Sequence, residues 1–418
     1  MGRDNKKKLN ILIATIEPFP KGMANTNRIT SYAKGMVELG HSVTVHCVKP
    51  TEQVGRQILN KKTKGTYNCI QYEYTAGTTV WPPHGKEKLK KMFLLFTGLK
   101  NSIRLILKYR KLRGIDGVIM NYHDVKDILA YKLLTVFLGI PLVYEISEFP
   151  FAINPLAKYR KNMLGRLYSN LYVNTVYKLF DGMIIMTHPL MEYFKKLTHK
   201  KSILVHVPMT VDYSRFEKNY PDAEKKYIAY AGAMGGNKDG VDILIRAFDL
   251  ISKDYSDYYL YLIGDAPEAD MTKLKNLAAR SESSDKIVFT GRVDNFEVPK
   301  IIMQAQILAL ARPSSLQATG GFPTKLGEYL ATGNPAIVTK VGDIPKYLKD
   351  GENAFISEPD SAEAFAEKMR FVIDNPDIAQ QVGINGKKVV YEFFNYKKQA
   401  QTISNLFYQL KFLSANTN

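Results

Sequence analysis

The sequence has few cysteines, no long uncharged apolar run and no Asp-x-Asp motif. Cys47 and Cys69 have neither metal-ligand nor disulfide-framework spacing, which is typical of a reducing cytosol. No window of 18 or more residues is apolar and uncharged enough to span a bilayer, so a transmembrane helix is not expected. The opening MGRDNKKKLN does not resemble a signal peptide. We therefore predict a cytoplasmic protein.

Acidic residues are scarce in the first half of the chain. Residues 1–217 hold 34 Lys+Arg against 15 Asp+Glu, a net charge of +19, whereas the remaining residues hold 24 against 25, a net charge of −1. Such an asymmetry favours a polyanionic partner for the first half, either a nucleic acid or an anionic membrane. Nucleic acid is the weaker choice because no recognisable nucleic-acid module accompanies the basic residues. A merely solvated basic surface would account for part of the excess.

Short apolar runs recur along all 418 residues, and helical patterns separate them. The runs lie at 9–16, 42–48, 116–121, 141–146, 182–187, 202–211, 227–232, 258–264, 286–291, 307–311 and 335–340. This alternation predicts α/β structure with parallel strands buried on both faces. The chain is long enough for two domains, and the charged segment 217–226 is the predicted linker. The segment 388–412 is predicted to be an amphipathic helical tail.

The most informative stretch is 312–338, which reads RPSSLQATGGFPTKLGEYLATGNPAIV. Two adjacent glycines predict a turn after the buried strand at 307–311, and a helix with marked ends follows. Pro323 can occupy its first turn, and Gly333 can take the left-handed position just past its end. A strand, a glycine-rich turn and a helix N-terminus together favour binding of an anion, usually a phosphate.

The spacing within this helix predicts which side faces inward. Leu326, Tyr329 and Leu330 fall at i, i+3 and i+4, so we expect them to pack into the core. Lys325 and Glu328 share a different side, from which they can reach solvent or a ligand. The alternative is that the glycines only make a tight turn and that Glu328 is a surface carboxylate.

The stretch resembles the nucleotide-sugar signature of the family 4 glycosyltransferases. In that family a glutamate, seven residues and a second glutamate straddle the turn, and a small-residue helix end with Gly-x-Pro follows. Glu328 and LATGNPAIV match the second half, whereas Gly320 stands where the first glutamate is expected. The resemblance implies that a set of residues binds the nucleotide sugar: Gly22, Gly232, Lys238, Arg292, Val293, Gly320, Gly321, Phe322, Pro323, Thr324, Lys325 and Glu328.

The resemblance also implies how the departing diphosphate is stabilised. The charge must be met by a metal, by cations or by helix N-termini, and the missing Asp-x-Asp motif favours a route without metal. Lys238 resembles the family's diphosphate-binding lysine, although Asp239 separates it from Gly240. Ala233 occupies the place of an arginine that the family usually has, and Arg312 either compensates or only forms a salt bridge.

The nucleobase and the acceptor are assigned in the same way. The family places the base against the backbone that follows a strand, here Gly291 to Val293, and Glu328 would accept hydrogen bonds from both ribose hydroxyls. The N-terminal domain usually supplies a histidine after the strand near 141–146, where this chain has Ser147 and Glu148. Glu148 is our candidate for contacting the acceptor or the sugar. His123 could serve instead, but a lone histidine is more often structural.

Residues 86–113 combine ten basic residues with a single acid, Glu87. Apolar residues recur there at steps of three and four, which predicts a basic amphipathic helix, either continuous or broken near Gly98. Interfacial membrane helices have this composition, but a surface helix whose apolar stripe faces the core has it too. We expect four residues to contact an anionic membrane or a lipid-linked acceptor: Lys90, Lys91, Lys100 and Arg104.

The resemblance implies a retaining glycosyltransferase of GT-B architecture, with two Rossmann-like domains facing a central cleft. The predicted domains are 1–216 and 217–397, with helix 398–414 crossing back to the first domain. The enzyme would transfer a sugar from a UDP- or GDP-sugar to a membrane-associated glycan or lipid-linked acceptor, without metal or bound cofactor, at the cytoplasmic face of a membrane. Glu148, Lys238 and Arg312 are the predicted catalytic residues. A sugar-nucleotide epimerase of the same fold and a non-catalytic binding protein are the alternatives.

Overall fold

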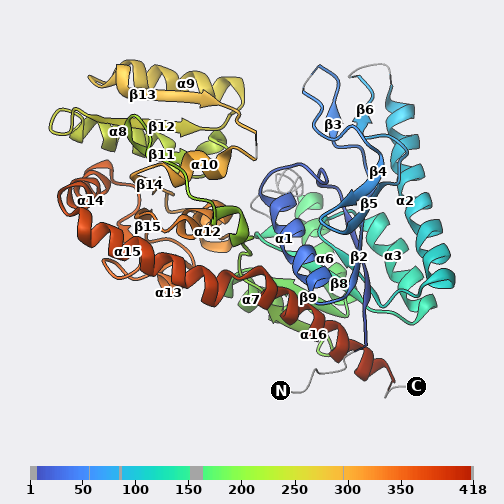
Figure 1. Cartoon of the computed structure of the whole chain (residues 1–418). Coiled ribbons are helices and arrows are strands. Elements are labelled where there is room, and N and C mark those ends of the chain that lie inside the picture. Colours follow the sequence, from blue (N-terminus) through green and yellow to red (C-terminus); the bar gives the residue numbers. More distant parts are fainter. Residues whose placement is uncertain (1–6, 56, 84–86, 151–162, 295, 416–418) are drawn as a thin grey trace. The chain divides into compact units, whose positions relative to one another are not determined.

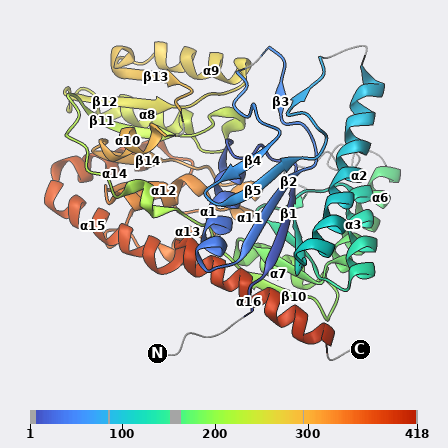
Figure 2. The ribbon, with the colours of Figure 1, turned by 45° about the vertical axis from the view of Figure 1, so that its right-hand side comes forward.

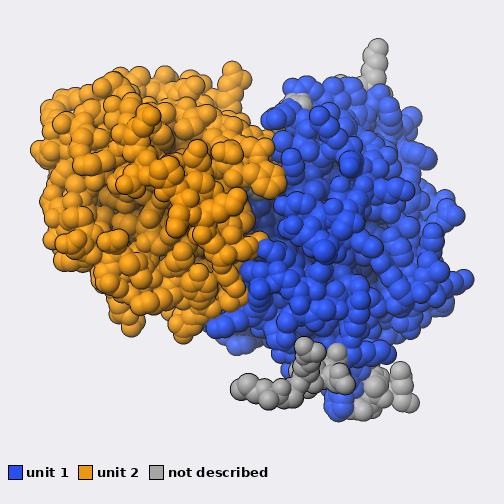
Figure 3. Space-filling view, in the orientation of Figure 1, with its two compact units in different colours: residues 1–210, 396–418 blue, residues 211–395 orange. Residues whose placement is uncertain are grey.

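The structure is a computed structural model that describes residues 7–55, 57–83, 87–150, 163–294 and 296–415. The chain forms two compact units, 1–210 with 396–418 and 211–395 (Figure 3). The first crossing between them lies at Thr210 and Val211, shortly before the charged segment 217–226 that we predicted as the linker. Val211 and Asn395, the two ends of the second unit, pair through an isolated β-bridge.

The N-terminal unit is built on an eight-stranded sheet in the order β10-β9-β8-β7-β1-β2-β5-β4 (Figure 1). All neighbours are parallel except β4 and β5. The strands are β1 (Asn10–Thr15), β2 (Ser42–Cys47), β4 (Lys64–Tyr67), β5 (Ile70–Tyr74), β7 (Gly117–Met120), β8 (Leu142–Ile146), β9 (Gly182–Ile185) and β10 (Ile203–His206). A separate two-stranded ladder joins β3 (Glu52–Gln53) to β6 (Val80–Trp81). Each apolar run predicted in this half contains a strand.

Helices cover both faces of this sheet. They are α1 (Ala24–Glu38), α2 (Lys88–Leu112), α3 (Val125–Leu138), α6 (Met163–Val176), η1 (Tyr177–Leu179), α7 (His188–Lys195) and α16 (Tyr396–Ala415). α1 and α16 pack on one face, and α2, α3, α6 and α7 contribute to the core on the other. The return of the C-terminal helix to the N-terminal unit is confirmed, because Ala400, Ile403 and Phe407 of α16 are fully buried there.

The C-terminal unit holds a six-stranded parallel sheet in the order β13-β12-β11-β14-β15-β16. Its strands are β11 (Lys226–Ala231), β12 (Tyr258–Ile263), β13 (Ile287–Gly291), β14 (Ile307–Leu310), β15 (Ala336–Thr339) and β16 (Phe355–Ser357). This is the 3-2-1-4-5-6 order of a Rossmann fold, in which the strand order reverses between the first and fourth strands. The N-terminal sheet reverses in the same way between β1 and β7.

Short and long helices connect these strands. They are η2 (Tyr213–Phe216), η3 (Gly235–Asn237), α8 (Val241–Ile251), α9 (Glu268–Ala279), η4 (Ser284–Lys286), α10 (Val298–Met303), α11 (Leu316–Gly320), α12 (Thr324–Thr332), α13 (Ile344–Tyr347), α14 (Ala362–Asp374), α15 (Pro376–Val389) and the π-helical turn η5 (Val390–Phe394). Within the described parts of the chain, every helix is too short or too polar to cross a lipid bilayer.

Candidate active site

The candidate site of the C-terminal unit lies where the order of its strands reverses. β11 and β14 are parallel neighbours, so the loops that follow Ala231 and Leu310 leave the same edge of the sheet. Gly240 holds the two loops together: its φ is +65°, and a Cβ atom there would lie 1.8 Å from the carbonyl oxygen of Ala311. Ligands of open parallel sheets bind at such a reversal, outside the carboxyl ends of the strands.

Lys325 meets an acidic partner at this edge. Its Nζ donates hydrogen bonds to Asp239 Oδ2 at 2.5 Å and to Tyr230 Oη at 2.6 Å. Only 14% of the Lys325 side chain is exposed, so of the two predicted alternatives, solvent or a ligand, contact with a ligand at this edge is the one that stays a prediction. Gly232 makes room for the ammonium group, since a Cβ atom there would lie 2.2 Å from Nζ. The first turn of α12 therefore places its lysine directly against the loop after β11.

Three cations surround Asp239. Burial raises the pKa of its carboxyl, but the charges of Lys325 and Arg312 outweigh this effect, with a smaller contribution from Lys238, so the pKa lies below its usual value. Burial lowers the pKa of Lys325, and Asp239 opposes that shift. The cluster of Lys238, Asp239, Arg312 and Lys325 thus carries three positive charges and one negative charge. A doubly charged anion such as a diphosphate would neutralise the excess.

Arg312 is held in place below the loop that follows β14. Its side chain is almost completely buried, and Nη2 donates to the carbonyl oxygen of Gln317 at 3.3 Å. Its own carbonyl oxygen accepts a hydrogen bond from Thr339 Oγ1 at 2.5 Å. Ser315 caps the short helix α11, with its hydroxyl accepting from the Ala318 N–H at 3.0 Å. These contacts hold Arg312 and the loop around it in place, and the charge of Arg312 lowers the pKa of Asp239.

The predicted glycine turn lies between α11 and α12. Gly320 is the last residue of α11, and Gly321 connects it to Phe322. The Phe322 ring is buried against Tyr347 and Phe394, with ring centroids 5.6 and 5.4 Å apart, so this side chain belongs to the core.

Pro323 precedes α12 rather than occupying its first turn, because its ψ of 109° is extended and the helix begins at Thr324. No side chain caps α12, which leaves N–H groups of its first turn able to bind an anion. At its other end, Gly333 has a φ of +85°, as we predicted for a left-handed cap. Leu326, Tyr329 and Leu330 are fully buried, as their spacing predicted.

Glu328 forms a salt bridge with Arg215, a residue that no sequence pattern had indicated. Arg215 of η2 donates from Nη1 to Glu328 Oε1 at 2.7 Å, and both side chains remain about one quarter exposed. The pair joins residues 113 positions apart in the same unit. The salt bridge orients the Glu328 carboxylate and occupies one of its oxygens.

The predicted base-binding segment lies further along the sheet. Gly291 ends β13 with a φ of +69°, and Arg292 and Val293 follow it in an exposed loop. β12 lies between β13 and β11, so this loop and the loop after β11 follow strands that are not neighbours. The structure therefore brings Gly232, Lys238, Arg312 and Lys325 together but places 292–293 two strands away.

The predicted residues of the N-terminal unit lie near its own strand reversal. Gly22 is in the loop between β1 and α1, where a Cβ atom would lie 2.0 Å from Thr26 Oγ1. Glu148 is half-buried and follows β8 by two residues. Glu145 has a structural role instead: it accepts from Arg28 Nε at 2.7 Å, and Arg28 also donates to two backbone carbonyls, of Val207 and Pro208.

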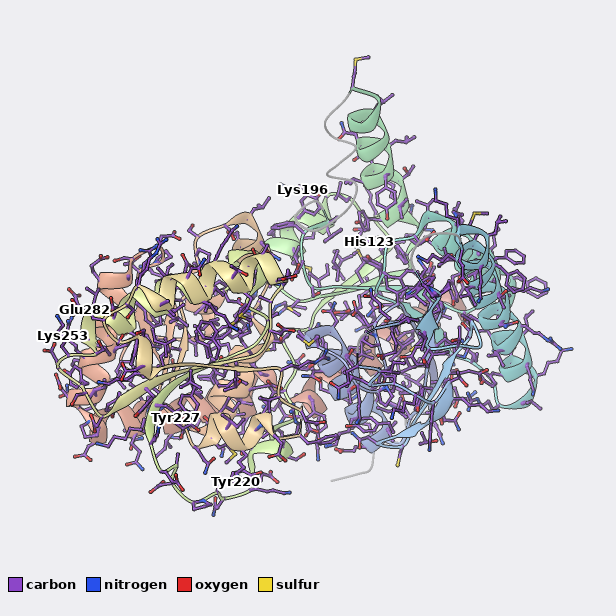
Figure 4. The ribbon with its side chains drawn as sticks, turned by 90° about the horizontal axis from the view of Figure 1, so that it is seen from above. His123, Lys196, Tyr220, Tyr227, Lys253 and Glu282 are labelled. Atoms are coloured by element: carbon purple, nitrogen blue, oxygen red, sulfur yellow. The ribbon has the colours of Figure 1, made fainter. Side chains whose placement is uncertain are left out.

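His123, the other candidate of this unit, is labelled in Figure 4 and is hydrogen-bonded to Tyr144. Its Nδ1 lies 2.7 Å from Tyr144 Oη, and its ring packs near Tyr177. Desolvation by this neighbourhood lowers the pKa of His123, although the residue is exposed at the surface. The imidazole is therefore neutral at pH 7 and available as a hydrogen-bonding group rather than as a cation.

Residues 214–389 match the family model of the glycosyl transferases group 1. One curated relative is N-acetyl-alpha-D-glucosaminyl L-malate synthase of Bacillus anthracis, which is 24% identical over 199 residues. That match covers 48% of this chain and half of the length of the relative. An uncharacterized glycosyltransferase of Methanocaldococcus jannaschii is 25% identical over 357 residues, covering 78% of this chain and 92% of that protein.

Solved structures share the fold over nearly the whole chain. Sucrose-phosphate synthase of Thermosynechococcus elongatus aligns with a TM-score of 0.73 at 16% identity, covering 97% of this chain and 99% of that one. Anabaena HepE in complex with UDP-glucose aligns with a TM-score of 0.69 at 13% identity, covering 96% and 100%. The architecture is thus GT-B, and residues 214–389 are similar to the group 1 glycosyl transferases.

Proposed function

We propose that the chain is a retaining, metal-independent family 4 glycosyltransferase that uses a UDP- or GDP-sugar as donor. The observation that carries this proposal is the cluster of Lys238, Arg312 and Lys325 around Asp239 at the strand reversal of the C-terminal unit. Negative charge grows on the leaving diphosphate as the bond to the sugar breaks. Preorganised cations in a partly water-excluded site stabilise that charge most effectively.

The remaining donor contacts follow from the same edge of the sheet. The uncapped N-terminus of α12 adds N–H groups beside the cations. Glu328 would accept hydrogen bonds from the ribose with the oxygen that Arg215 leaves accessible. The backbone at Arg292 and Val293 would contact the base, which suits recognition with little side-chain preference. HepE, which shares the fold, was solved with UDP-glucose, and this supports a nucleotide-sugar donor.

Glycine at position 320 is compatible with a second class of function. A glutamate at this position is expected to contact the transferred sugar in the family, and glycine offers no side chain for it. A sugar-nucleotide epimerase or a non-catalytic binding protein would be compatible with that loss. Turnover distinguishes these cases, since only the transferase releases a nucleoside diphosphate in proportion to acceptor glycosylated.

The acceptor is proposed from the distribution of charge. Residues 1–210 and 396–418 hold 36 Lys+Arg against 13 Asp+Glu, a net charge of +23, whereas 211–395 have a net charge of −5. The cationic unit would hold a membrane-associated glycan or lipid-linked acceptor at the cytoplasmic face of an anionic membrane. Gly22 and Glu148, near the strand reversal of this unit, are the residues we propose to contact the acceptor or the sugar.

The test is release of UDP or GDP from a panel of nucleotide sugars, with EDTA present to remove metal. Lys238→Ala is expected to lower turnover about 100-fold, the scale of losing one transition-state donor, and to weaken nucleotide binding less. Lys253→Ala is the matched control, because Lys253 is an exposed lysine of the same unit that pairs with Glu282 (Figure 4). Full turnover of Lys238→Ala, or no release from any donor by the wild type, would contradict the proposal.

A further inference from the structure

Helix α2 turns an apolar surface toward solvent over its first half. Leu89, Met92, Phe93 and Phe96 are 63 to 81% exposed. They fall at i, i+3, i+4 and i+7, so they form one row along one side of the helix. Large exposed apolar rows of this kind are uncommon on monomeric soluble proteins and mark interaction sites.

The orientation of α2 is fixed by its opposite side. A Cβ atom at Gly98 would lie 2.0 Å from the carbonyl oxygen of Val48, so the helix backbone touches the end of β2. Ser102 Oγ lies 2.8 Å from His46 Nδ1 and 2.6 Å from Tyr131 Oη, inside the core. The apolar stripe predicted for 86–113 therefore divides: its later members, such as Leu99 and Ile103, pack inward, while its first members remain exposed.

The second half of α2 presents cations on the side where the first half presents apolar groups. Lys100 follows Leu89 by eleven residues, about three helical turns, so both point to the same side. Arg104, Lys108 and Lys111 continue the exposed basic row. The helix contains eight lysines and arginines and no acidic residue.

A second apolar row lies on α3, which packs beside α2 on the same face of the N-terminal sheet (Figures 1 and 2). Leu129, Leu133, Val136 and Phe137 are 47 to 80% exposed. Their spacing of i, i+4, i+7 and i+8 places them on one side, opposite the buried Ile128, Tyr131 and Leu134. Nothing in the sequence analysis had singled out this helix.

We propose that the outward sides of α2 and α3 form one docking surface for an anionic lipid bilayer. The row on α3 and the first half of α2 insert among the acyl chains, and the basic second half of α2 contacts phosphate headgroups. The inference deepens the proposed function, because it rests on an acceptor held at a membrane and names the surface that reaches it. Insertion adds a salt-resistant contribution to the electrostatic attraction.

Charge selects the bilayer over a second copy of the chain. A symmetric dimer through this surface would bring two helices with eight cations each together, with no acid on either α2 to offset them. An anionic bilayer supplies both a hydrophobic interior and negative headgroups. The apolar residues on the exposed side of α2 match the hydrophobic interior, and the basic residues on the same side match the negative headgroups.

The test is co-sedimentation of the full chain with vesicles of phosphatidylcholine alone or mixed in equal parts with phosphatidylglycerol. Wild type is expected to bind the mixed vesicles at least about tenfold more tightly, and to keep part of that binding in about 1 M salt, where the Debye length is only about 3 Å. Leu133→Ser with Phe137→Ser is expected to abolish the salt-resistant part. Lys100→Glu with Arg104→Glu is expected to abolish the preference for anionic lipid.

The controls are matched changes on the C-terminal unit, namely Ile378→Ser for the exposed apolar residues and Lys273→Glu with Lys275→Glu for the charges. These variants should bind like the wild type. The proposal is overturned if wild type binds both vesicles equally or neither, or if the α3 variant keeps full binding at high salt. A dimer in sedimentation velocity that Leu133→Ser with Phe137→Ser dissociates would assign the surface to a second copy instead.

Nucleotide release without vesicles separates this inference from the proposed function. Leu133 and Phe137 lie on the exposed side of α3 in the N-terminal unit, and the cation cluster lies in the C-terminal unit, so release from a nucleotide sugar should be unchanged in Leu133→Ser with Phe137→Ser. Membrane binding with no turnover on any donor would refute the transferase and leave the docking surface standing. Turnover with no membrane binding would refute the docking surface and leave the transferase standing.

Discussion

Arg215 and Glu328 show how one side chain can position another for a ligand. The salt bridge occupies Oε1 of Glu328 and orients the carboxylate, so its second oxygen is preorganised for the ribose. If the carboxylate became ordered only on binding, the entropy cost of ordering it would offset part of the free energy gained from the hydrogen bond. In this arrangement Arg215 acts through Glu328 and is a positioning residue.

Glu328→Gln should weaken binding of UDP or GDP by about 1–3 kcal/mol, the scale of a lost charge-assisted hydrogen bond. Arg215→Met should raise the KM for the donor with a smaller change in kcat, because it disturbs the binding of the ribose and not the cations at the diphosphate. Isothermal titration and donor kinetics measure the two effects. Glu367→Gln, an exposed glutamate of the same unit, is the control. Unchanged nucleotide affinity in Glu328→Gln would remove this residue from the site.

Individual site residues could be predicted where a local motif marked them. Lys238, Arg312 and Lys325 were proposed from the family resemblance, and each follows a strand or opens a helix beside glycines. The partners of these residues could not be found in this way, because they are joined only by the fold. Lys325 contacts Asp239 and Tyr230 across 86 and 95 residues, and no spacing rule reports such a pair.

Among the elements, strands with continuous apolar runs were predictable, including β10 and β13 at sheet edges, whereas β3, β4, β5 and β6 were not. Central parallel strands are buried on both faces and therefore read as unbroken apolar runs. β4 and β5 lie at the edge of the N-terminal sheet and alternate exposed with buried residues, and β3 and β6 have only two residues each. Helix α2 was recognisable from its periodicity, but periodicity does not say whether an apolar row faces a core or a membrane.

Gly98 provides a test of how α2 is held. Alanine is the better helix former by about 1 kcal/mol, so Gly98→Ala would stabilise a freely exposed helix. Here the new methyl group would meet a backbone carbonyl, which cannot rotate away, and α2 must shift. We expect a net loss of about 1–3 kcal/mol in the free energy of unfolding, the range for overpacking.

Urea unfolding followed by fluorescence of Trp81 measures this loss, since the single tryptophan lies in the N-terminal unit. Thr97→Ala is the control on the neighbouring residue of the same helix. A Gly98→Ala protein at least as stable as the wild type would mean that α2 does not rest on the end of β2.

At the scale of the whole molecule, the two units repeat one topology with different chemistry. Both sheets reverse strand order beside their first strand, so each has a ligand-binding edge. The C-terminal edge gathers cations around Asp239, and the N-terminal unit carries the overall positive charge and the exposed apolar rows. The alternation of apolar runs and helices was sufficient to predict this architecture. The proposed partners, a nucleotide sugar and an anionic membrane, depend on which side chains lie on the surface, and the alternation does not show that.

All seven histidines lie in the N-terminal unit, which predicts that acid destabilises this unit first. His46 is completely buried, and burial lowers its pKa from 6.5 to about 3. Below pH 6.5 the unfolded chain binds a proton at this site that the folded chain does not. The contribution of His46 to stability is therefore complete above pH 6.5 and is lost progressively as the pH falls toward 3.

At pH 5 the loss from His46 alone is about 2 kcal/mol relative to pH 7, from roughly 1.4 kcal/mol per pH unit below 6.5. His123, whose pKa is also lowered, makes the protein less stable as the pH falls. Its effect is smaller than that of His46 because His123 is exposed. Burial raises the pKa values of Glu17 and Asp127, which opposes the trend at lower pH.

Urea unfolding monitored by Trp81 at pH 7 and pH 5 should show the loss of stability. His46→Gln should reduce stability at pH 7 yet flatten its pH dependence, whereas the exposed His199→Gln should behave like the wild type. An equal pH dependence in His46→Gln and wild type would mean that His46 is not the group that couples acid to unfolding.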